Sequence, residues 1–188
     1  MATVGILALQ GDVEAHAAAL AALGHEARPV KTAEALASVD ALVLPGGEST
    51  TMLKLLREEG LFEPLRDFCR SGRTVFGTCA GAILLARAVT HPEQESLGVL
   101  DVEVQRNGYG RQIDSFITKL SGPAGLDEVE AVFIRAPIIR GAGPEVEVVL
   151  EHGGLPVLVR QGPVWAATFH PEMTDDGRLL AHILADVG

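Results

Sequence analysis

A cysteine between two glycines is the clearest candidate for covalent chemistry in this chain. Cys79 follows an apolar run at 74–76 and precedes a helical pattern at 80–88, with Gly77 and Gly81 two positions to either side. This is the spacing of the G-x-nucleophile-x-G turn of hydrolases, with cysteine in place of serine. Small residues at the flanking positions relieve backbone crowding in such a sharp turn. The pattern therefore predicts a nucleophile at Cys79.

The expected position of Cys79 at a helix N-terminus also bears on its reactivity. The helix dipole favours the thiolate there, and the amide of Ala80 would point toward an oxyanion formed at Cys79. A buried, inert thiol is the alternative, because free cysteines are commonly buried. The second cysteine, Cys69, lies in a helical run beside Phe68, and we expect it to pack in the core.

A cysteine nucleophile needs a base, and the base needs a group that holds its tautomer. Of six histidines, only His170 ends an apolar strand pattern, and strand ends are where α/β sites collect. Glu172 can turn back toward it, because residues two apart in extended chain face the same way. The His-x-Glu triplet also arises by chance, and it recurs in a polar loop at 91–93. We expect the other histidines to be surface or capping residues, namely His16, His25, His91, His152 and His182.

Two glycines, Gly46 and Gly47, follow another apolar strand pattern. Glycines let backbone amides approach a ligand closely, and the G-x-x-x-x-G-K pattern of a phosphate loop is absent. One interpretation is a plain strand–helix turn capped by Ser49 or Thr50. The other is a loop whose Gly47 amide completes an oxyanion hole with the Ala80 amide. The nucleophile pattern nearby favours the second.

Strand and helix patterns alternate through the first half of the chain. Strands are predicted there at 4–9, 41–44 and 74–76, and helices at 12–23, 50–58, 61–69 and 80–88. Asp12 occupies an N-cap position and Gly24 a C′ position. The second half is richer in strands, predicted at 101–104, 114–120, 129–134, 146–151, 156–160 and 164–169, before a closing helix at 176–187. We expect an α/β fold, a flavodoxin-like three-layer sandwich with a mainly parallel sheet and helices on both faces.

Length and composition fit this picture. The 188 residues suit one domain with a full core, and we expect a single domain over 1–188. No apolar run reaches the roughly 18 residues of a membrane-spanning helix, and the N-terminus lacks a signal-peptide pattern, so we expect a cytoplasmic protein. The formal net charge is −10 and no block of Lys and Arg occurs. That balance argues against nucleic-acid binding.

In chain order, the Pro-Gly-Gly, Gly-x-Cys-x-Gly and His-Pro-Glu segments resemble the class I, triad-type glutamine amidotransferases. Further runs resemble the family of glutaminase subunits of pyridoxal 5′-phosphate synthase. These runs are Leu9–Val13 (LQGDV), Leu44–Thr51 (LPGGESTT), Phe76–Gly81 (FGTCAG), Arg106–Gln112 (RNGYGRQ), Val132–Pro137 (VFIRAP) and Phe169–Glu172 (FHPE). The resemblance spans nearly the whole chain. Gly108-Tyr109 departs from it, because the family leads us to expect a small polar residue and phenylalanine there.

The resemblance implies a catalytic triad of Cys79, His170 and Glu172. It also implies a glutamine site formed by Gly47, Glu48, Ser49, Arg106, Ile134 and Arg135. Arg106 and Glu48 carry the charges that glutamine's α-carboxylate and α-amine require. In the implied reaction the cysteine attacks the side-chain amide, the two loop amides hold the oxyanion, and the histidine acts as acid and then as base. No metal or organic cofactor is required.

A chain of 188 residues filled by a glutaminase has no room for a synthase domain, so the acceptor site should lie on another protein. The resemblance implies a separate (β/α)8-barrel synthase subunit, a hetero-oligomeric complex, and docking that switches the glutaminase on. We expect the docking surface around the first helix and Gln10. Two alternatives stay open: an amidotransferase subunit of purine, histidine or nucleotide synthesis, and a redox-sensing thiol on a fold with the same cysteine turn. The runs at 106–112 and 134–137 argue against the first, and the His-Pro-Glu segment argues against the second.

Overall fold

The computed structural model describes residues 1–106 and 115–187. Its helices are α1 (Val13–Ala22), α2 (Ala33–Ala37), α3 (Ser49–Glu58), α4 (Phe62–Arg70), α5 (Ala80–Leu85), the 3-10 turn η1 (Pro171–Met173) and α6 (Arg178–Ile183). Its strands are β1 (Thr3–Leu7), β2 (Glu26–Val30), β3 (Ala41–Leu44), β4 (Thr74–Thr78), β5 (Ala86–Thr90), β6 (Leu100–Gln105), β7 (Ser115–Leu120), β8 (Val129–Ile134), β9 (Ile138–Ala142), β10 (Glu147–His152), β11 (Leu155–Gln161) and β12 (Val164–Ala167). The start of the strand expected at 114 and the Gly108-Tyr109 position lie outside the described residues.

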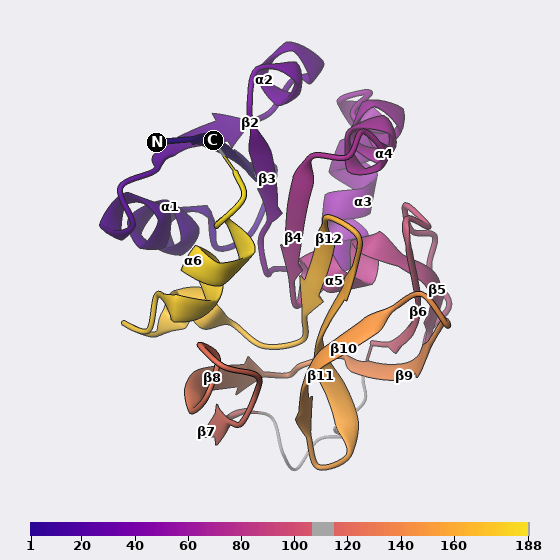
Figure 1. Ribbon diagram of the computed structural model, residues 1–188. Coiled ribbons are helices and arrows are strands. Elements are labelled where there is room, and N and C mark those ends of the chain that lie inside the picture. Colours follow the sequence, from indigo (N-terminus) through magenta and orange to yellow (C-terminus); the bar gives the residue numbers. More distant parts are fainter. Residues whose placement is uncertain (107–114, 188) are drawn as a thin grey trace.

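A seven-stranded sheet runs through the middle of the molecule in the order β10-β11-β12-β4-β3-β1-β2. The five strands from β12 to β2 are parallel, and β11 and β10 continue the sheet antiparallel at one edge. Helices α1 and α6 cover one face, and α3, α4 and α5 cover the other (Figure 1). Every residue of β3 is buried, as expected for a strand covered on both faces. The predicted three-layer α/β fold with a mainly parallel sheet is confirmed.

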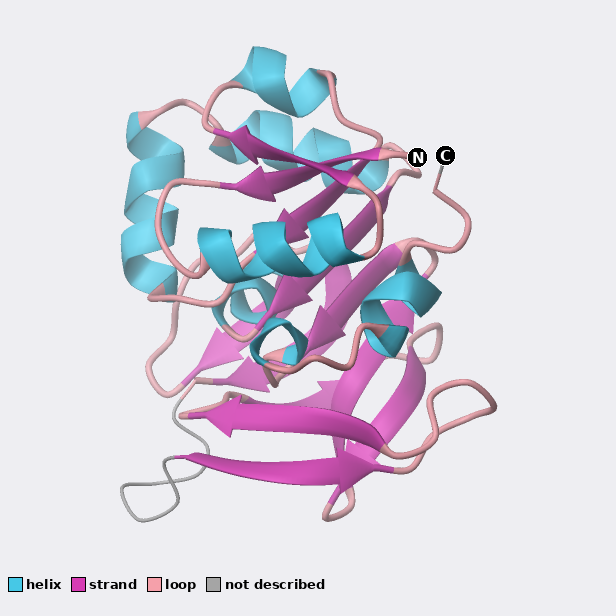
Figure 2. Ribbon diagram, turned by 90° about the vertical axis from the view of Figure 1, so that its left-hand side faces the viewer, coloured by secondary structure: helices cyan, strands magenta, loops and turns pink. Residues whose placement is uncertain are grey.

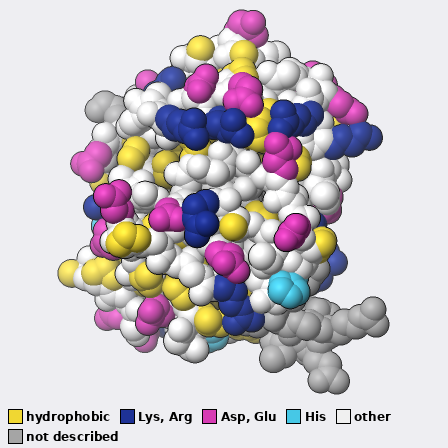
Figure 3. All heavy atoms as spheres, turned by 90° about the vertical axis from the view of Figure 1, so that its right-hand side faces the viewer, with side chains coloured by type: hydrophobic (Ala, Val, Ile, Leu, Met, Phe, Trp, Pro, Cys, Tyr) yellow, Lys and Arg dark blue, Asp and Glu magenta, His cyan; other side chains and the backbone are white. Residues whose placement is uncertain are grey.

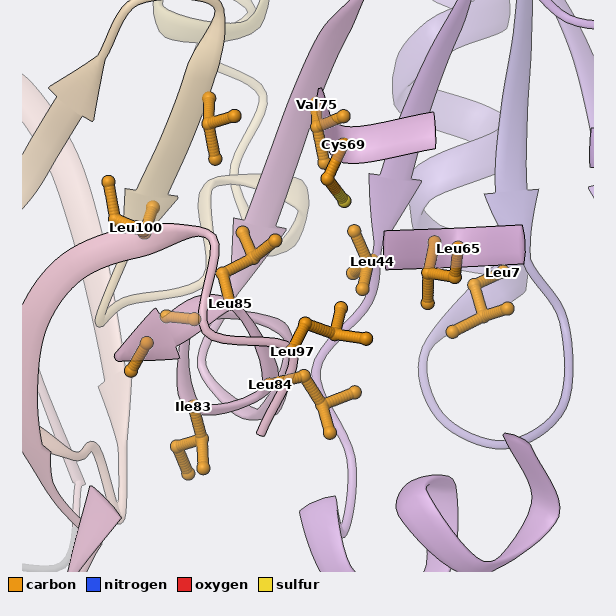
Figure 4. Close-up of a cluster of buried hydrophobic side chains, with 14 of the residues drawn as sticks. Leu7, Leu44, Leu65, Cys69, Val75, Ile83, Leu84, Leu85, Leu97 and Leu100 are labelled. Carbon is orange, nitrogen blue, oxygen red and sulfur yellow. The ribbon is translucent and has the colours of Figure 1, made fainter. Parts of the chain in front are cut away.

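Two apolar clusters fill the spaces between the sheet and its helices. Leu20 of α1, Phe76 of β4 and Leu180 of α6 belong to the cluster on one face. Leu44 of β3 and Cys69 of α4 belong to the cluster on the other face, where Figure 4 shows Cys69 among leucine side chains. Cys69 is 3% exposed, so the expectation that it packs in the core is confirmed.

Two smaller sheets extend the second half of the chain. Strands β5, β6 and β9 form one of them, and the antiparallel pair β7–β8 forms the other. The β7–β8 pair lies at the bottom of the view in Figure 2, and the carbonyl of Val132 in β8 accepts a hydrogen bond of 2.8 Å from the amide of His170. The β8 strand thereby holds the segment that follows β12.

Several predicted boundaries were wrong. The helix expected at 80–88 ends at Leu85, because the next five residues form β5 and pair with β6. The helix expected at 176–187 covers only Arg178–Ile183. Strand β2, helix α2 and strand β9 were not predicted. Strand β2 contains charged residues and Pro29, which a sheet edge tolerates.

The helix caps also differ from expectation. Asp12 occupies the N-cap of α1, but its side chain makes no capping hydrogen bond. Helix α3 is capped by Glu48, whose carboxylate accepts from the amides of Thr50 and Thr51, and Ser49 is the first helical residue. Gly24 follows α1 with a φ of +79°, as its predicted C′ role requires.

Charges of both signs alternate on the face that carries α3, α4, β5 and β6 (Figure 3). Ion pairs join many of them, including Arg57–Glu95, Arg66–Glu63 and Arg87–Asp101. Exposed pairs of this kind contribute little to stability. Among the helices of 1–106 and 115–187, none has the length and apolar character needed to cross a lipid bilayer.

Candidate active site

Three neighbouring parallel strands end at the same edge of the central sheet. Residue Leu44 of β3 pairs with Gly77 of β4, and Thr78 of β4 pairs with Ala167 of β12. The glycine loop follows β3, Cys79 follows β4, and His170 follows β12 by three residues. Because parallel strands have their carboxyl ends at one edge, these three segments meet there.

The turn at Cys79 is as sharp as its flanking glycines predict. Cys79 has a φ of +48°, a conformation that is strained for any residue other than glycine. A Cβ added to Gly81 would lie 2.1 Å from the carbonyl oxygen of Leu44, and one added to Gly77 would lie 2.7 Å from the carbonyl carbon of Gly81. The predicted backbone crowding is therefore present. It lets Cys79 lie half-buried at the sheet edge, directly before α5.

A pocket of about 560 Å³ opens at this edge. Of the residues named from the sequence, Gly47, Glu48, Ser49, Cys79, Arg106, Ile134, Arg135 and His170 line it. Gln10, Asp12, Ile83, Pro137 and Met173 line it as well, without having been predicted as site residues. Ala80 lies beside Cys79 at the first position of α5 and is buried. Its amide therefore belongs to the helix start, where no carbonyl of the same helix is available to it.

His170 and Glu172 form a buried hydrogen-bonded pair. Nδ1 of His170 lies 2.8 Å from Oε1 of Glu172, and the side chains are 5% and 1% exposed. Burial disfavours the charged ring, but hydrogen bonding and charge from Cys79 and Glu172 outweigh it and raise the pKa of His170 to about 10. Burial likewise opposes ionisation of Glu172, yet hydrogen bonds from His16 and His170 hold its pKa at about 2. The pair is therefore an imidazolium and a carboxylate at neutral pH.

The glycine loop is packed tightly against its neighbours. A Cβ on Gly46 would lie 2.5 Å from Cε1 of His170, and one on Gly47 would lie 2.6 Å from Oε1 of Gln10. The same Gln10 oxygen accepts a 2.8 Å hydrogen bond from the amide of Glu48. Gly47 has a φ of +153°. The loop thus requires glycines at both positions and is tied by Gln10 to the segment before α1.

Glu48 and Arg106, the two charged residues expected to bind glutamine, contact each other. Nη2 of Arg106 lies 3.1 Å from Oε1 of Glu48. Glu48 accepts hydrogen bonds from Thr50 and Thr51, and the one from the hydroxyl of Thr50 contributes most to lowering the pKa of Glu48 to about 2. These hydrogen bonds hold the carboxylate at the start of α3. Arg135, which also lines the pocket, has a φ of +42°, and such strain is concentrated at functional sites.

His16 was wrongly expected at the surface or in a cap. It is 1% exposed, and its Nε2 lies 3.1 Å from Oγ1 of Thr78 and 3.4 Å from Oε1 of Glu172. A sequence signal for this existed: His16 and Leu20 lie four residues apart, so both fall on the same face of α1. That face packs against the sheet directly behind the site.

One group of possible metal-binding side chains occurs among the described residues. Ligand atoms of Asp12, His170 and Glu172 lie within 4.8 Å of one another. Nδ1 of His170 is 3.9 Å from Oδ2 of Asp12 but 2.8 Å from Glu172. The geometry at Nδ1 is that of a hydrogen bond to a carboxylate, which orients the ring and leaves Nε2 for the pocket.

Comparisons with known proteins agree over nearly the whole chain. The model of the SNO glutamine amidotransferase family matches residues 6–186. The pyridoxal 5′-phosphate synthase subunit PdxT of Acidothermus cellulolyticus is 54% identical, covering 98% of this chain and 93% of its own. The protein of the same name from Solibacter usitatus is 52% identical, covering 95% and 96%.

Two solved structures are similar to this chain. A crystal structure of a glutamine amidotransferase has a TM-score of 0.92 at 50% identity, with 97% of each chain covered. PurLQS from Thermotoga maritima has a TM-score of 0.71 at 17% identity, with 98% of this chain and 99% of that chain covered. The second likeness shows a shared fold alone.

Proposed function

This chain belongs to the SNO glutamine amidotransferase family, and on that premise we propose that Cys79, His170 and Glu172 are its catalytic residues. The chain is a glutaminase subunit of pyridoxal 5′-phosphate synthase, which hydrolyses glutamine and supplies ammonia to a synthase partner. The observation that carries the assignment of residues is the meeting of the glycine loop, Cys79 and His170 in one pocket at three adjacent strand ends.

Thioester formation is the first half of the reaction. Cys79 reacts as its thiolate, beside the ring of His170, whose pKa is raised to about 10 by hydrogen bonds and charge from Cys79 and Glu172 that outweigh its burial. The thiolate attacks the side-chain amide carbon of glutamine, and the amides of Gly47 and Ala80 donate to the oxyanion. Each such donor is worth about 3 kcal/mol in comparable sites. His170 then gives its proton to the departing ammonia, leaving a γ-glutamyl thioester.

Hydrolysis of the thioester is the second half. His170, now neutral, takes a proton from water as the water attacks the thioester carbonyl. The carboxylate of Glu172 keeps Nδ1 protonated, so Nε2 faces the reacting atoms in the tautomer that can accept a proton. Collapse of the second tetrahedral intermediate releases glutamate and restores the thiolate.

Glutamine is held by the other residues that line the pocket. Arg106 and Glu48 already lie 3.1 Å apart, so a bound amino acid would insert its α-carboxylate and α-ammonium groups next to opposite charges. Gly47, Ser49, Ile134 and Arg135 supply the remaining contacts. Ser49 is oriented by a 2.9 Å hydrogen bond to Oε1 of Gln94.

The partner is a (β/α)8-barrel synthase subunit that uses the ammonia to build pyridoxal 5′-phosphate. Residues 1–188 form a single glutaminase domain in this proposal, and the complex acts in the cytoplasm. Its docking surface includes α1 and Gln10. Support comes from the 2.8 Å hydrogen bond that ties Gln10 to the amide of Glu48, because contact with Gln10 from outside would reach the glycine loop.

Ammonia release from glutamine, measured with and without the barrel subunit, tests the proposal. We expect strong stimulation by the partner and no activity above background for Cys79→Ala or His170→Ala. Cys69→Ala is the matched control, because that thiol is buried in the core. Activity in either site variant would overturn the assignment of the nucleophile or base. Full activity of the isolated chain would refute dependence on the partner.

A further inference from the structure

His16 touches the carboxylate behind the catalytic histidine. Its Nε2 lies 3.4 Å from Oε1 of Glu172, the same oxygen that lies 2.8 Å from Nδ1 of His170. The side chains of His16 and Glu172 are each 1% exposed. The other carboxylate oxygen, Oε2, is buried and has no hydrogen-bond partner among the described residues. Oε1 therefore carries the contacts that fix this carboxylate.

The proton on His16 can be placed from these contacts. A nitrogen lone pair 3.4 Å from a carboxylate oxygen would bring two acceptors together, so the neighbouring charge favours a proton on Nε2. This N–H then points between Glu172 and the hydroxyl of Thr78, which lies 3.1 Å away. Both ring nitrogens that approach Oε1, one from α1 and one from the end of β12, are donors.

We propose that His16 is a positioning residue for the glutaminase reaction, which holds Oε1 of Glu172 and through it the ring of His170. This inference rests on the proposed function, since it concerns the same triad. His16 does not line the pocket at Cys79 and is not a catalytic residue. His16 supplies a second donor to Oε1 of Glu172, so that the carboxylate keeps its orientation when His170 loses its proton during the reaction.

The charged surroundings explain why a second donor is needed there. Asp12 approaches His170 Nδ1 to 3.9 Å from the start of α1. Asp175 and Asp176, before α6, line the same pocket of about 390 Å³ as His16 and Glu172. Thr78, which contacts His16, directly precedes Cys79 in the chain. With acidic groups on two sides, loss of the His16 donor leaves Nδ1 of His170 as the one remaining side-chain donor to Oε1 of Glu172 among the described residues.

The test compares His16→Leu, which removes the donor, with His16→Gln, whose amide nitrogen can occupy the place of Nε2. Glutamine hydrolysis is measured with the synthase subunit present. We expect kcat to fall about tenfold in His16→Leu with KM unchanged, because a hydrogen bond to a charged group is lost and no glutamine contact is altered. His16→Gln should recover most of the loss. His16→Asn, whose amide is too short to reach Glu172, should behave like His16→Leu and replaces it should the apolar variant not fold.

A second readout does not require turnover. The rate at which iodoacetamide alkylates Cys79 near neutral pH should fall severalfold in His16→Leu and return in His16→Gln, because alkylation depends on the cysteine–histidine pair. If the proposed function is wrong, the chain without substitutions will not hydrolyse glutamine. The alkylation rates of the His16 variants would still decide the role of His16.

Three results would overturn the inference. The first is an alkylation rate of Cys79 and a kcat that, in both His16→Leu and His16→Asn, stay within about twofold of the values for the chain without substitutions. Another is an equal loss in His16→Gln, which would mean that His16 acts by its shape. The third uses Thr78→Val as background: an effect of His16→Leu that disappears there would show that His16 acts through Thr78.

Discussion

The two thiols of this chain lie in opposite environments. Cys69 packs among apolar side chains of α4 and its neighbours, and burial raises the pKa of its thiol to about 12. Cys79 lies at the start of α5, beside a histidine whose ring is held protonated. A thiolate is the reactive form of cysteine. Reactivity should therefore separate the two residues completely in the folded protein.

We predict that iodoacetamide labels the native protein once, at Cys79, and labels both cysteines after unfolding. Mass spectrometry of the intact chain and its peptides gives the count and the position. Glutamine should slow the labelling, because it occupies the pocket that Cys79 lines. The Cys79→Ala variant is the control and should remain unlabelled while folded. Labelling of native Cys69 at a comparable rate would contradict the assignment.

Glu172 should matter to the rate more than to glutamine binding. In Glu172→Gln the amide can present its NH2 group to Nδ1 of His170, which favours the tautomer with the proton on Nε2. That tautomer cannot accept a proton from water. We expect kcat to fall about 100-fold or more with KM little changed. Steady-state kinetics with the synthase subunit would show it, and a change confined to KM would contradict the role given to Glu172.

For individual residues, the sequence predicted the functional residues that lie in short motifs. It did not predict those whose role depends on packing between distant segments. The glycines around Cys79 and the His-Pro-Glu segment identify residues that the fold brings into one place. His16 could not be identified as a neighbour of Glu172, because the two lie 156 positions apart and meet only when α1 packs on the sheet. Its helical spacing from Leu20 indicates a buried face, not what it touches there.

Among the elements, the contact of α5 with β3 sets the geometry of the cysteine turn. Gly81 belongs to the first turn of α5, and its missing side chain allows the carbonyl of Leu44 to approach. Backbone lies on both sides of this contact, so no side-chain rotation can relieve a clash. The close approach brings the glycine loop, which follows Leu44, next to Cys79.

The variant Gly81→Ala should therefore lose both stability and activity. Its Cβ would lie 2.1 Å from the Leu44 oxygen, so α5 and β3 must separate, at a cost of about 1–3 kcal/mol in the free energy of unfolding. Urea denaturation and glutaminase assays measure the two effects. Gly141→Ala is the matched control, because its Cβ would meet one atom at 3.9 Å, an ordinary contact. Equal behaviour of the two variants would contradict this account of the turn.

Helices and strands were predicted correctly where apolar runs are continuous. The predictions failed where pairing with a distant strand determines the secondary structure. The predicted strand at 41–44 has its predicted bounds, and β4 extends the one at 74–76 by two residues. Residues 86–88 are good helix formers, yet they enter β5 because β6 is available for pairing. Propensity is a weak prior that such contacts override. Strand β2, with Pro29, is stable only as the edge of an existing sheet.

At the scale of the whole molecule, strand order explains why distant segments meet. Strand β4 lies between β3 and β12, although β12 follows β4 in sequence by more than 80 residues. The sequence indicated a parallel sheet but not this order. The site therefore depends on the integrity of the entire sheet.

The buried His170–Glu172 pair should also link the stability of the whole molecule to pH. The pKa of His170 is raised from 6.5 to about 10, so its contribution is full below pH 6.5 and is lost as the pH rises toward 10. The pKa of Glu172 is lowered from 4.5 to about 2, so its contribution is full above pH 4.5 and is lost as the pH falls toward 2. Together they stabilise the fold most between these two unfolded-state values.

Urea denaturation across this range, with His170→Gln and Glu172→Gln beside the unmodified chain, measures both limbs. The difference in unfolding free energy between the unmodified chain and His170→Gln should be constant below pH 6.5 and shrink as the pH rises toward 10. The difference for Glu172→Gln should be constant at intermediate pH and shrink as the pH falls from 4.5 toward 2. A His170→Gln difference that stays constant up to pH 10 would mean that folding does not raise the pKa of His170, so that the ring is neutral in the folded protein above pH 6.5. In that case the cysteine–histidine ion pair on which the proposed reaction begins would not exist before glutamine binds.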